Sequence, residues 1–341
     1  MAFGRLALST AAPLLAAGIA MAGASAPAAA VTNIKIGSPT INESTHEWMK
    51  VFKTRVEKRA PDRFSVGVFP LSQLGTIPRM IEGVQFGTIE MAVIPPDFMV
   101  GIDKRFGILS APGVFDDLMH GYRVTHDPEF KKAFWTLGEK KGVHMVGINC
   151  TTDSAIGSRT AIRKIADFKG KKIRVFASAM ERETMKRLGA TAAPMPLAEV
   201  LPAIQRGVLD GAKSGMVIFV ALKYVNTAKY VTRTNESLVC TAEIASKSWL
   251  GKLSESDRKI VIEESEKNDP EIQQFSLGFN ENTYKAWQQQ GGELIELSPA
   301  ERKQFRERLA TVGDAVAQQE PEMKEIWELL KRLSVKHREK K

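Results

Sequence analysis

Apolar and polar positions along residues 31–150 follow two different periods in turn. Stretches with an apolar residue at every second position predict strands, and stretches with a 3.6-residue period predict amphipathic helices. Trp48, Phe52 and Val56 follow the helical period, and Ser44 is a candidate N-cap for that helix. The elements predicted here are strands over 33–39, 64–70, 89–96 and 143–150 and helices over 44–60, 77–87 and 128–142.

A second cycle of strands and helices begins near Thr151. The last ninety residues have a charged, helical pattern, in which Pro270 predicts a kink or break at Asn268 and Asp269. Alternation of this kind predicts an α/β protein. The elements predicted before the helical end are strands over 171–176, 208–215 and 230–247 and helices over 178–190 and 197–207.

The two cycles are joined without a low-complexity linker, so we expect the chain to cross between two lobes several times. Each lobe should contain a mixed sheet flanked by helices, and the ligand cleft should lie between the lobes. Residues 31–150 with about 240–278 are assigned to lobe 1. Residues 151–239 with about 279–341 are assigned to lobe 2.

The first thirty residues differ in composition from the rest. Arg5 precedes an Ala-rich apolar run from Leu6 to Ala22, which Pro13 interrupts, and small residues follow it. This layout is typical of a secretory signal peptide, and an uncleaved membrane anchor is the alternative. We therefore expect residues 1–30 to be a signal peptide and the mature protein to be periplasmic.

Charge and size exclude some classes of partner. The chain has 341 residues, which is enough for two lobes with separate cores, and a net charge of +9. Because basic and acidic residues are interspersed along an exported chain, we expect no nucleic-acid partner. A positive net charge attracts anionic solutes, although it can also serve solubility alone.

Arg174 is the candidate binding residue that the pattern itself singles out. It lies inside Ile173–Phe176, which has the composition of a buried strand. Arginine keeps its charge and is seldom buried without a partner. The partner is either an acidic side chain or the carboxylate of a ligand, which accepts two parallel hydrogen bonds from a guanidinium. Of Phe176 and Met180, which flank Arg174, we expect one to line the cleft and the other to lie in the core.

Neither the cysteines nor the histidines form a metal-binding pattern. The five histidines lack the HExxH spacing, and GxSxG, GxGxxG and P-loop motifs are absent. The sequence thus predicts no cofactor, no metal site and no catalytic constellation. Cys150 and Cys240 lie where the chain should cross between lobes, and they either form a disulfide or pack as free thiols.

Two long segments resemble the DctP-type solute-binding proteins of tripartite ATP-independent periplasmic (TRAP) transporters. FPLSQLGTIPRMIEGVQFGTIEMAVI, residues 69–94, is similar to the P-x-x-Q-L-G segment and following helix of that family. IADFKGKKIRVF and the residues after it, to Ala212, are similar to its D-x-x-G-x-K-I-R-V, L-G-A-x-P-x-P-M and E-V-x-x-A-L-Q-x-G-x-x-D-G run. The resemblance implies a two-lobed periplasmic-binding-protein architecture, TRAP membrane permease subunits as partners, and a ligand carboxylate bound by Arg174.

The chain differs from the family pattern at three positions. Ser154 stands where sialic-acid binders have a second arginine, Ser214 where many relatives have asparagine, and Leu197 where an aromatic residue is common. With one cation and one amide fewer, the resemblance implies a monocarboxylate, such as a 2-oxo, 2-hydroxy or aromatic acid. The expected ligand-binding residues are therefore Arg174, Phe176, Ser154, Ser214 and Leu197, joined by position at strand ends by Asn42, Glu43 and Pro95.

We expect a monomeric receptor that binds an organic acid and performs no chemistry. One alternative is a ligand-sensing subunit for a sensor kinase, and another is an exported enzyme on a two-lobed scaffold. Lys213 and Arg159 are the first candidates for a second cation if the ligand is a dicarboxylate. The other interpretation of Lys213 is that it is solvated or paired.

Overall fold

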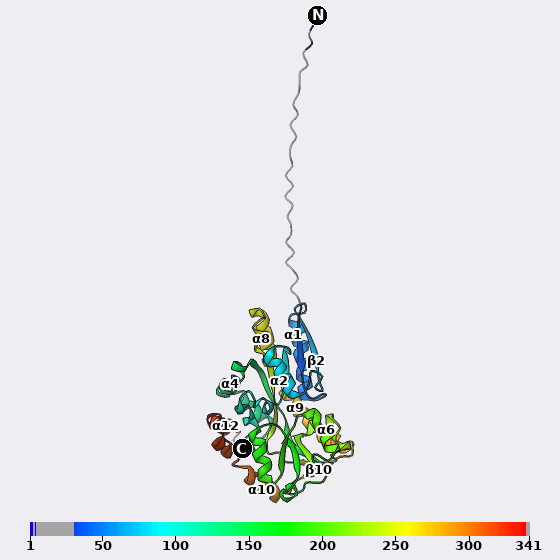
Figure 1. Cartoon of the computed structure of the whole chain (residues 1–341), viewed down its shortest axis with the longest axis vertical. Helices are drawn as coiled ribbons and strands as arrows, with labels where there is room; N and C mark the ends of the chain where they lie inside the picture. The colour runs from blue at the N-terminus through cyan, green and yellow to red at the C-terminus, as the bar shows by residue number, and fades with distance from the viewer. Residues whose placement is uncertain (3, 5–30, 339–341) are drawn as a thin grey trace. The chain divides into compact units, whose positions relative to one another are not determined.

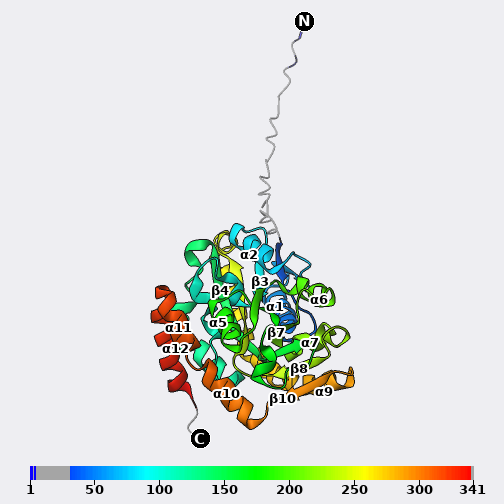
Figure 2. The ribbon, with the colours of Figure 1, turned by 60° about the horizontal axis from the view of Figure 1, so that its bottom comes forward.

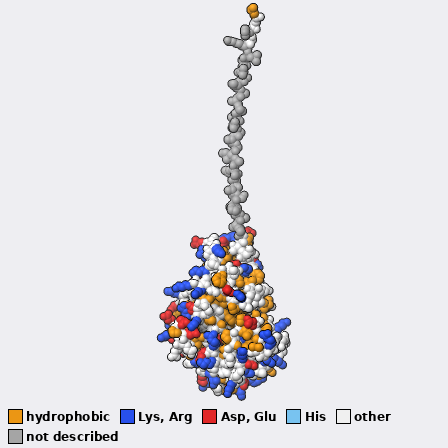
Figure 3. Space-filling view, in the orientation of Figure 1, with side chains coloured by type: hydrophobic (Ala, Val, Ile, Leu, Met, Phe, Trp, Pro, Cys, Tyr) orange, Lys and Arg blue, Asp and Glu red, His pale blue; other side chains and the backbone are white. Residues whose placement is uncertain are grey.

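The structure is a computed structural model that describes residues 31–338 together with residues 1, 2 and 4. The predicted signal peptide, residues 1–30, lies outside the described residues apart from those three positions. No helix in the described part of the chain has both the length and the hydropathy needed to cross a membrane. Lys and Arg side chains are interspersed with Asp and Glu over the face seen in Figure 3.

Parallel and antiparallel strands are mixed in one hydrogen-bonded path, in the order β2-β1-β3-β9-β4-β7-β5-β6, and β8 pairs with β4 and β10. Helices flank these strands in both views of the ribbon (Figure 1 and Figure 2), which confirms the predicted α/β class. The strands are β1 (Thr32–Gly37), β2 (Phe64–Phe69), β3 (Met91–Ile94), β4 (Val143–Ser158), β5 (Lys172–Val175), β6 (Thr191–Pro194), β7 (Gly211–Gly215), β8 (Tyr230–Arg233), β9 (Leu238–Ser246) and β10 (Glu293–Glu296).

Most of the predicted helices are present within a few residues of their expected ends. The helix expected over 128–142 ends early, at Phe134, and the strand expected over 230–247 is divided into two strands, β8 and β9. The sequence pattern missed the helices α3, α7 and α8 and the strands β6 and β10. The helices are α1 (Ser44–Arg59), α2 (Ile77–Phe86), α3 (Leu118–Thr125), α4 (Pro128–Phe134), α5 (Ala179–Leu188), α6 (Leu197–Gln205), α7 (Met216–Ala221), α8 (Lys247–Leu250), α9 (Glu255–Gln289), α10 (Pro299–Leu309), α11 (Val312–Gln319) and α12 (Lys324–His337).

Strand β4 connects the two halves of the sheet path. It pairs with β9 from Val143 to Asp153 and with β7 from Ser154 to Ser158. We call β2, β1 and β3 the first half of the path and β7, β5 and β6 the second half. The sequence predicted that this strand ends at Cys150, but it continues because the polar residues after Cys150 are buried between neighbouring strands and keep the ladder.

Helix α9 is continuous through Pro270, so of the predicted kink or break the break is wrong. Two residues just before the proline anchor it to α1: Asn268 Nδ2 donates to the carbonyl of Trp48 at 2.8 Å, and Asp269 Oδ1 accepts from Trp48 Nε1 at 3.1 Å. These buried hydrogen bonds compensate for the one that the proline cannot donate. At about 1.5 Å per residue, α9 is long enough to pack on α1 near one end and on α7 and β10 towards the other.

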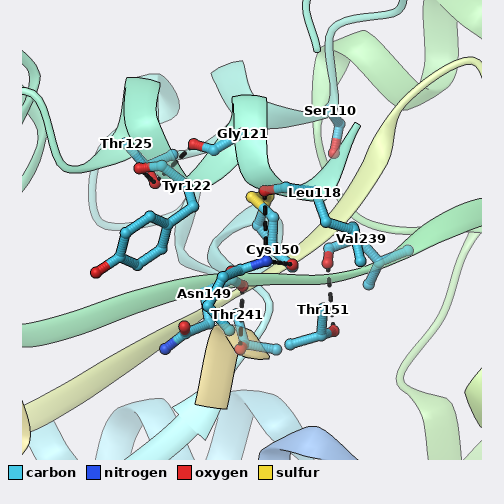
Figure 4. The surroundings of a disulfide bond; sticks show 12 residues. Ser110, Leu118, Gly121, Tyr122, Thr125, Asn149, Cys150, Thr151, Val239 and Thr241 are labelled. Carbon is cyan, nitrogen blue, oxygen red and sulfur yellow. Dashed lines mark hydrogen bonds between the residues drawn. A yellow bond between two sulfur atoms is a disulfide. The ribbon is translucent and has the colours of Figure 1, made fainter. Parts of the chain in front are cut away.

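Cys150 and Cys240 form a disulfide between β4 and β9. Their Cα atoms lie 3.8 Å apart, and the two residues are direct partners in the antiparallel register. Helix α3 lies against the sulfur atoms, as Figure 4 shows at Gly121. A Cβ atom at Gly121 would come within 2.6 Å of Leu238 Cδ1, so the end of the Leu238 side chain would have to move, and within 3.5 Å of the Cys150 sulfur, which is an ordinary contact. The expected proximity of the two crossovers is confirmed.

Candidate ligand-binding site

A small cavity lies where the strand ends of the two halves of the path meet. Its free volume is about 30 Å³, room for about two water molecules, so an organic ligand fits only if the lining parts separate. The lining residues are Pro39, Thr40, Glu43, Thr45, Ile77, Val93, Pro95, Thr151, Arg174, Phe176, Leu197, Ser214, Ile218, Val239 and Thr241.

Backbone carbonyls hold the guanidinium of Arg174 in place. Its Nε donates to the carbonyl of Met195 at 2.9 Å, and its Nη1 donates to the carbonyl of Lys213 at 3.0 Å. The side chain is 1% exposed, yet Nη2 has no hydrogen-bond partner among the described residues. A buried donor without a partner costs about 1–3 kcal/mol, so this nitrogen is available to an acceptor that enters the cavity.

Arg174 makes no ion pair within the described part of the chain, since no carboxylate oxygen lies within 4.0 Å of it. The guanidinium instead lies over the rings of Phe176, 4.7 Å away, and Phe98, 5.7 Å away. Burial lowers its pKa, while the nearby Tyr224 and Glu181 act to raise it. An arginine pKa starts so far above neutrality that the group stays charged. The salt-bridge interpretation of Arg174 therefore has no support from the geometry.

Glu43 brings a carboxyl group to the same cavity. It caps α1, where Oε2 accepts from the backbone N–H of Thr45 at 2.9 Å and Oε1 from that of His46 at 3.2 Å. The hydroxyl of Thr40 donates to Oε1 at 2.6 Å. Glu43, and not the predicted Ser44, is thus the N-cap, and this role buries it. Burial raises the pKa of Glu43, although the hydrogen bonds from Thr40 and Thr45 oppose the shift.

The structure brings together most of the residues that the sequence nominated. Phe176 lines the cavity, whereas Met180 lies in the hydrophobic core, as expected of one residue of this pair. The nominated residues that line the cavity are Arg174, Phe176, Leu197, Ser214, Glu43 and Pro95.

Ser154 and Asn42 do not line the cavity. The Ser154 hydroxyl donates to Glu236 Oε2 at 2.7 Å, because β4 runs past the cavity and directs this side chain towards the loop before β9. Asn42 adopts a left-handed backbone conformation, φ 56°, and its N–H donates to His46 Nδ1, so it shapes the turn before α1.

Several lining residues were missed by the sequence analysis. Thr151 and Thr241 each follow a cysteine of the disulfide, so the expected crossovers were a signal that could have found them. Ile218 belongs to α7, a helix that was not predicted. Within the described ranges, no group of His, Cys, Asp and Glu side chains is arranged to hold a metal ion.

Comparison with known proteins identifies the family. Residues 38–320 match DctP, described as bacterial extracellular solute-binding protein, family 7. The chain belongs to this family. The resemblance of its sequence motifs is thereby confirmed, and membership in a family of solute-binding receptors means that the protein binds a solute and is not an enzyme.

Curated DctP relatives share about a quarter of their residues with this chain. The C4-dicarboxylate-binding periplasmic protein DctP of Rhodobacter capsulatus is 26% identical over 276 residues, 78% of this chain and 80% of the relative. The 2,3-diketo-L-gulonate-binding periplasmic protein YiaO of Escherichia coli is 26% identical over 236 residues, 68% and 71% of the two chains. The match to uncharacterized protein YiiZ of Salmonella typhimurium, 28% identical over 210 residues, spans 61% of this chain and 64% of YiiZ.

Solved structures support the DctP-family fold. The sugar acid binding protein DctPAm from Advenella mimigardefordensis, in complex with galactonate, has a TM-score of 0.86 and 23% identity, covering 90% of this chain and 99% of that one. A TRAP periplasmic solute binding protein from Desulfovibrio salexigens, with bound orotic acid, has a TM-score of 0.84 and 23% identity, with the same coverage. The expected two-lobed periplasmic-binding fold is thus confirmed.

Proposed function

We propose that the protein is the periplasmic receptor of a TRAP-type importer and that it binds a monocarboxylate through Arg174. The observation that carries this proposal is the guanidinium held by two backbone carbonyls, with its remaining nitrogen free at the cavity. A fork fixed in this way needs no further ordering to meet a carboxylate oxygen, which favours affinity. Export through a signal peptide at residues 1–30 is part of the same proposal.

The charges around the cavity support a single carboxylate. Arg174 is the only cationic residue in the described lining, and Glu43 adds a carboxyl group to it. Lys213 is neutralised by two glutamates and, like Arg159, is not part of the lining. A second ligand carboxylate would thus be buried near Glu43 without a cation, which is unfavourable.

The polar lining supports a hydroxylated acid. Five residues with a hydroxyl group, Thr40, Thr45, Thr151, Thr241 and Ser214, are among the lining residues. Together with the Glu43 carboxyl they offer acceptors to ligand hydroxyls, and the apolar residues between them cover the carbon chain. A 2-hydroxy acid, such as a sugar acid, fits this mixture best, and proteins of similar structure have been solved with galactonate and with L-gulonate bound.

The proposed binding motion opens and closes the two lobes. Residues 31–150 with about 240–278 make lobe 1, and residues 151–239 with about 279–320 make lobe 2. Helix α12 packs on α3 and α4, so we assign it to lobe 1 although the sequence assigned it to lobe 2. The lining comes from both lobes, so a bound acid stabilises the closed form that a permease must distinguish from the open form.

A thermal-shift screen tests the ligand class. The panel contains D-galactonate, L-gulonate, D-erythronate and orotate as monocarboxylates and succinate as a dicarboxylate. A ligand at 100 times its Kd adds about 2.7 kcal/mol to the free energy of unfolding, which gives a clear rise in melting temperature. We expect a monocarboxylate to give the largest rise. Tenfold tighter binding of succinate in a subsequent titration would contradict the single-carboxylate proposal.

Uptake measurements test the transporter partner. Candidate TRAP permease subunits are reconstituted in vesicles, and uptake of the labelled acid is followed with and without the receptor. We expect uptake only in the presence of the wild-type receptor. Uptake that is independent of the receptor would contradict the proposed partner while leaving the binding function intact.

A further inference from the structure

Five buried ionisable side chains form a cluster that extends from the cavity into the protein. Arg174 and Lys213 are each 1% exposed, Glu181 is 0%, Asp97 4% and Glu236 5% exposed. We call these five residues the buried cluster. Fully buried charges are rare unless they are paired, so each pairing within the cluster carries information.

Lys213 is the centre of the buried cluster. Its Nζ lies 2.6 Å from Glu181 Oε1 and 2.9 Å from Glu236 Oε1, and it also donates to the Ser237 hydroxyl at 3.1 Å. The backbone carbonyl of the same lysine accepts the hydrogen bond from Arg174 Nη1. The ligand-binding guanidinium and the buried ion pairs are therefore connected through one residue of β7.

Asp97 joins the buried cluster from the other half of the sheet path. It lies in the 3-10 helix Pro96–Met99 after β3, where Oδ1 accepts from the Ser110 hydroxyl at 2.6 Å. It also interacts with the hydroxyl of Ser178, the N-cap of the helix that carries Glu181. The buried cluster thus contains groups from both proposed lobes.

The charges of the buried cluster do not balance. Two cations face three carboxyl groups, and the only ion pairs join Lys213 to Glu181 and Glu236 within the described residues. Glu181 Oε2 has no hydrogen-bond partner there, nor does the hydroxyl of Thr184 one turn further along the same helix. A ligand carboxylate on Arg174 would add a fourth negative charge to this low-dielectric region.

Glu181 is the carboxyl group of the buried cluster that is best placed to take up a proton when this negative charge is added. Burial raises its pKa to about 7, and although Lys213 opposes the shift, Asp97 and Glu236 add to it. On the other elements that pack against α5, five charged residues have ion-pair partners outside the buried cluster: Lys104 with Glu322, Arg105 with Asp103, Arg302 with Glu296, Lys303 with Glu307, and Asp314 with Lys331. The groups that act on Glu181 are therefore those of the buried cluster.

We propose that Glu181 takes up a proton from solvent when an acid binds to Arg174, so that ligand capture is coupled to proton uptake by the buried cluster. The proton forms an O–H bond at Oε2, and Oε1 keeps its contact with Lys213. This inference rests on the proposed function, since it requires a ligand carboxylate at Arg174. Linkage then requires affinity to fall as pH rises, because the bound form holds more protons than the free form.

Calorimetry in paired buffers measures the proton directly. The full chain is titrated with D-galactonate, or with the panel acid that binds most tightly, in phosphate and in Tris at the same pH. Buffers differ in ionisation enthalpy, so the difference in observed heat gives the number of protons taken up. We expect uptake of between zero and one proton near pH 7.5, and almost none at pH 5.5, where Glu181 is already protonated.

Titrations of two variants test whether Glu181 is the residue that takes up the proton. Glu181→Gln should abolish the uptake and remove the loss of affinity between pH 7 and 8, which we expect to be about threefold to tenfold for the wild type. Glu183→Gln is the matched control: it lies on the same helix, but pairs with Arg187 at 2.9 Å outside the buried cluster. It should behave as the wild type does.

The outcomes separate this inference from the function on which it rests. Equal heats in both buffers across pH 5.5–8.5, with tight binding, overturn proton coupling and leave the receptor function standing. Uptake that persists in Glu181→Gln and disappears in Asp97→Asn overturns the assignment to Glu181. Binding of no acid at all overturns both. If Glu181→Gln does not fold, the wild-type pH profile alone still decides whether uptake occurs.

Discussion

Replacement of Arg174 is the most direct test of the site. Arg174→Ala removes the guanidinium that would bind the ligand carboxylate, and Arg174→Lys keeps a charge but loses the planar fork. Truncating one partner of a buried, hydrogen-bonded charge pair costs about 2–5 kcal/mol, which is about 30- to 4000-fold in Kd. The lysine variant should lose at least about tenfold, because one ammonium cannot reproduce two parallel hydrogen bonds.

The structure also sets the effect of this change on stability. The alanine variant leaves the carbonyls of Met195 and Lys213 without a donor, and each buried acceptor costs about 1–3 kcal/mol. It also removes a buried nitrogen that had no partner, which offsets part of the loss. We therefore expect the free energy of unfolding to fall by about 1–3 kcal/mol, which leaves the protein folded at room temperature.

Calorimetric titration with the acid found in the screen is the assay, and circular dichroism confirms that each variant is folded. Arg159→Ala is the matched control, since it removes an exposed arginine outside the cavity. It should bind as the wild type does. A folded Arg174→Ala variant with unchanged Kd, or an equal loss in Arg159→Ala, would refute the carboxylate role of Arg174.

Three further predictions concern the disulfide, the buried cluster and the cavity. Serine at both Cys150 and Cys240 should lower the free energy of unfolding by about 4 kcal/mol, because the disulfide closes a loop with a sequence separation of 90. Urea unfolding measures this change in free energy, and two alkylatable thiols in unreduced protein would contradict the disulfide. Because the folded pKa of Glu181, about 7, exceeds its ordinary 4.5, its contribution to stability is lost as pH rises from about 4.5 to about 7. Glu181→Gln should flatten this part of the pH profile of the urea midpoint, and an unaltered profile would refute the shift. Glu43→Gln should raise the affinity for a dicarboxylate relative to that for a monocarboxylate by about tenfold, because it removes a like charge from the cavity. Competitive titration measures the ratio of the two Kd values, and an unchanged ratio would contradict a role of Glu43.

Local sequence patterns were sufficient to predict many helices and strands and to single out one residue of the ligand-binding site, Arg174. The composition of Ile173–Phe176 predicted a buried strand, and the helical pattern predicted α1 and α5, because those signals depend only on residue types within a few positions of one another. They failed where tertiary contacts outweigh local preference. Pro270 remains helical because Asn268 and Asp269 are tied to α1.

Hydrogen-bond and ion-pair partners that are distant in the sequence could not be predicted from it. Lys213 could have been solvated or paired, and only the fold shows that Glu181 and Glu236 enclose it. The resemblance implied that Ser154 falls where some relatives have a ligand-binding arginine, yet here its hydroxyl donates to Glu236. The spacing of residues along the chain does not determine which of them meet at a strand crossing, so these roles could not be assigned from one sequence.

The sequence by itself determined the α/β class, the DctP resemblance and an arginine inside a strand that needs an anionic partner. Those properties are written in periodicity and in residue type, which act over a few positions at a time. Tertiary structure decided that the arginine has no internal carboxylate, that the cysteines are bridged, and that the buried cluster carries one carboxyl group too many. The physical reason is that solvation and pairing of a charge depend on every group packed around it, and those groups come from distant parts of the chain, 39 residues apart for Arg174 and Lys213 and 82 for Ser154 and Glu236.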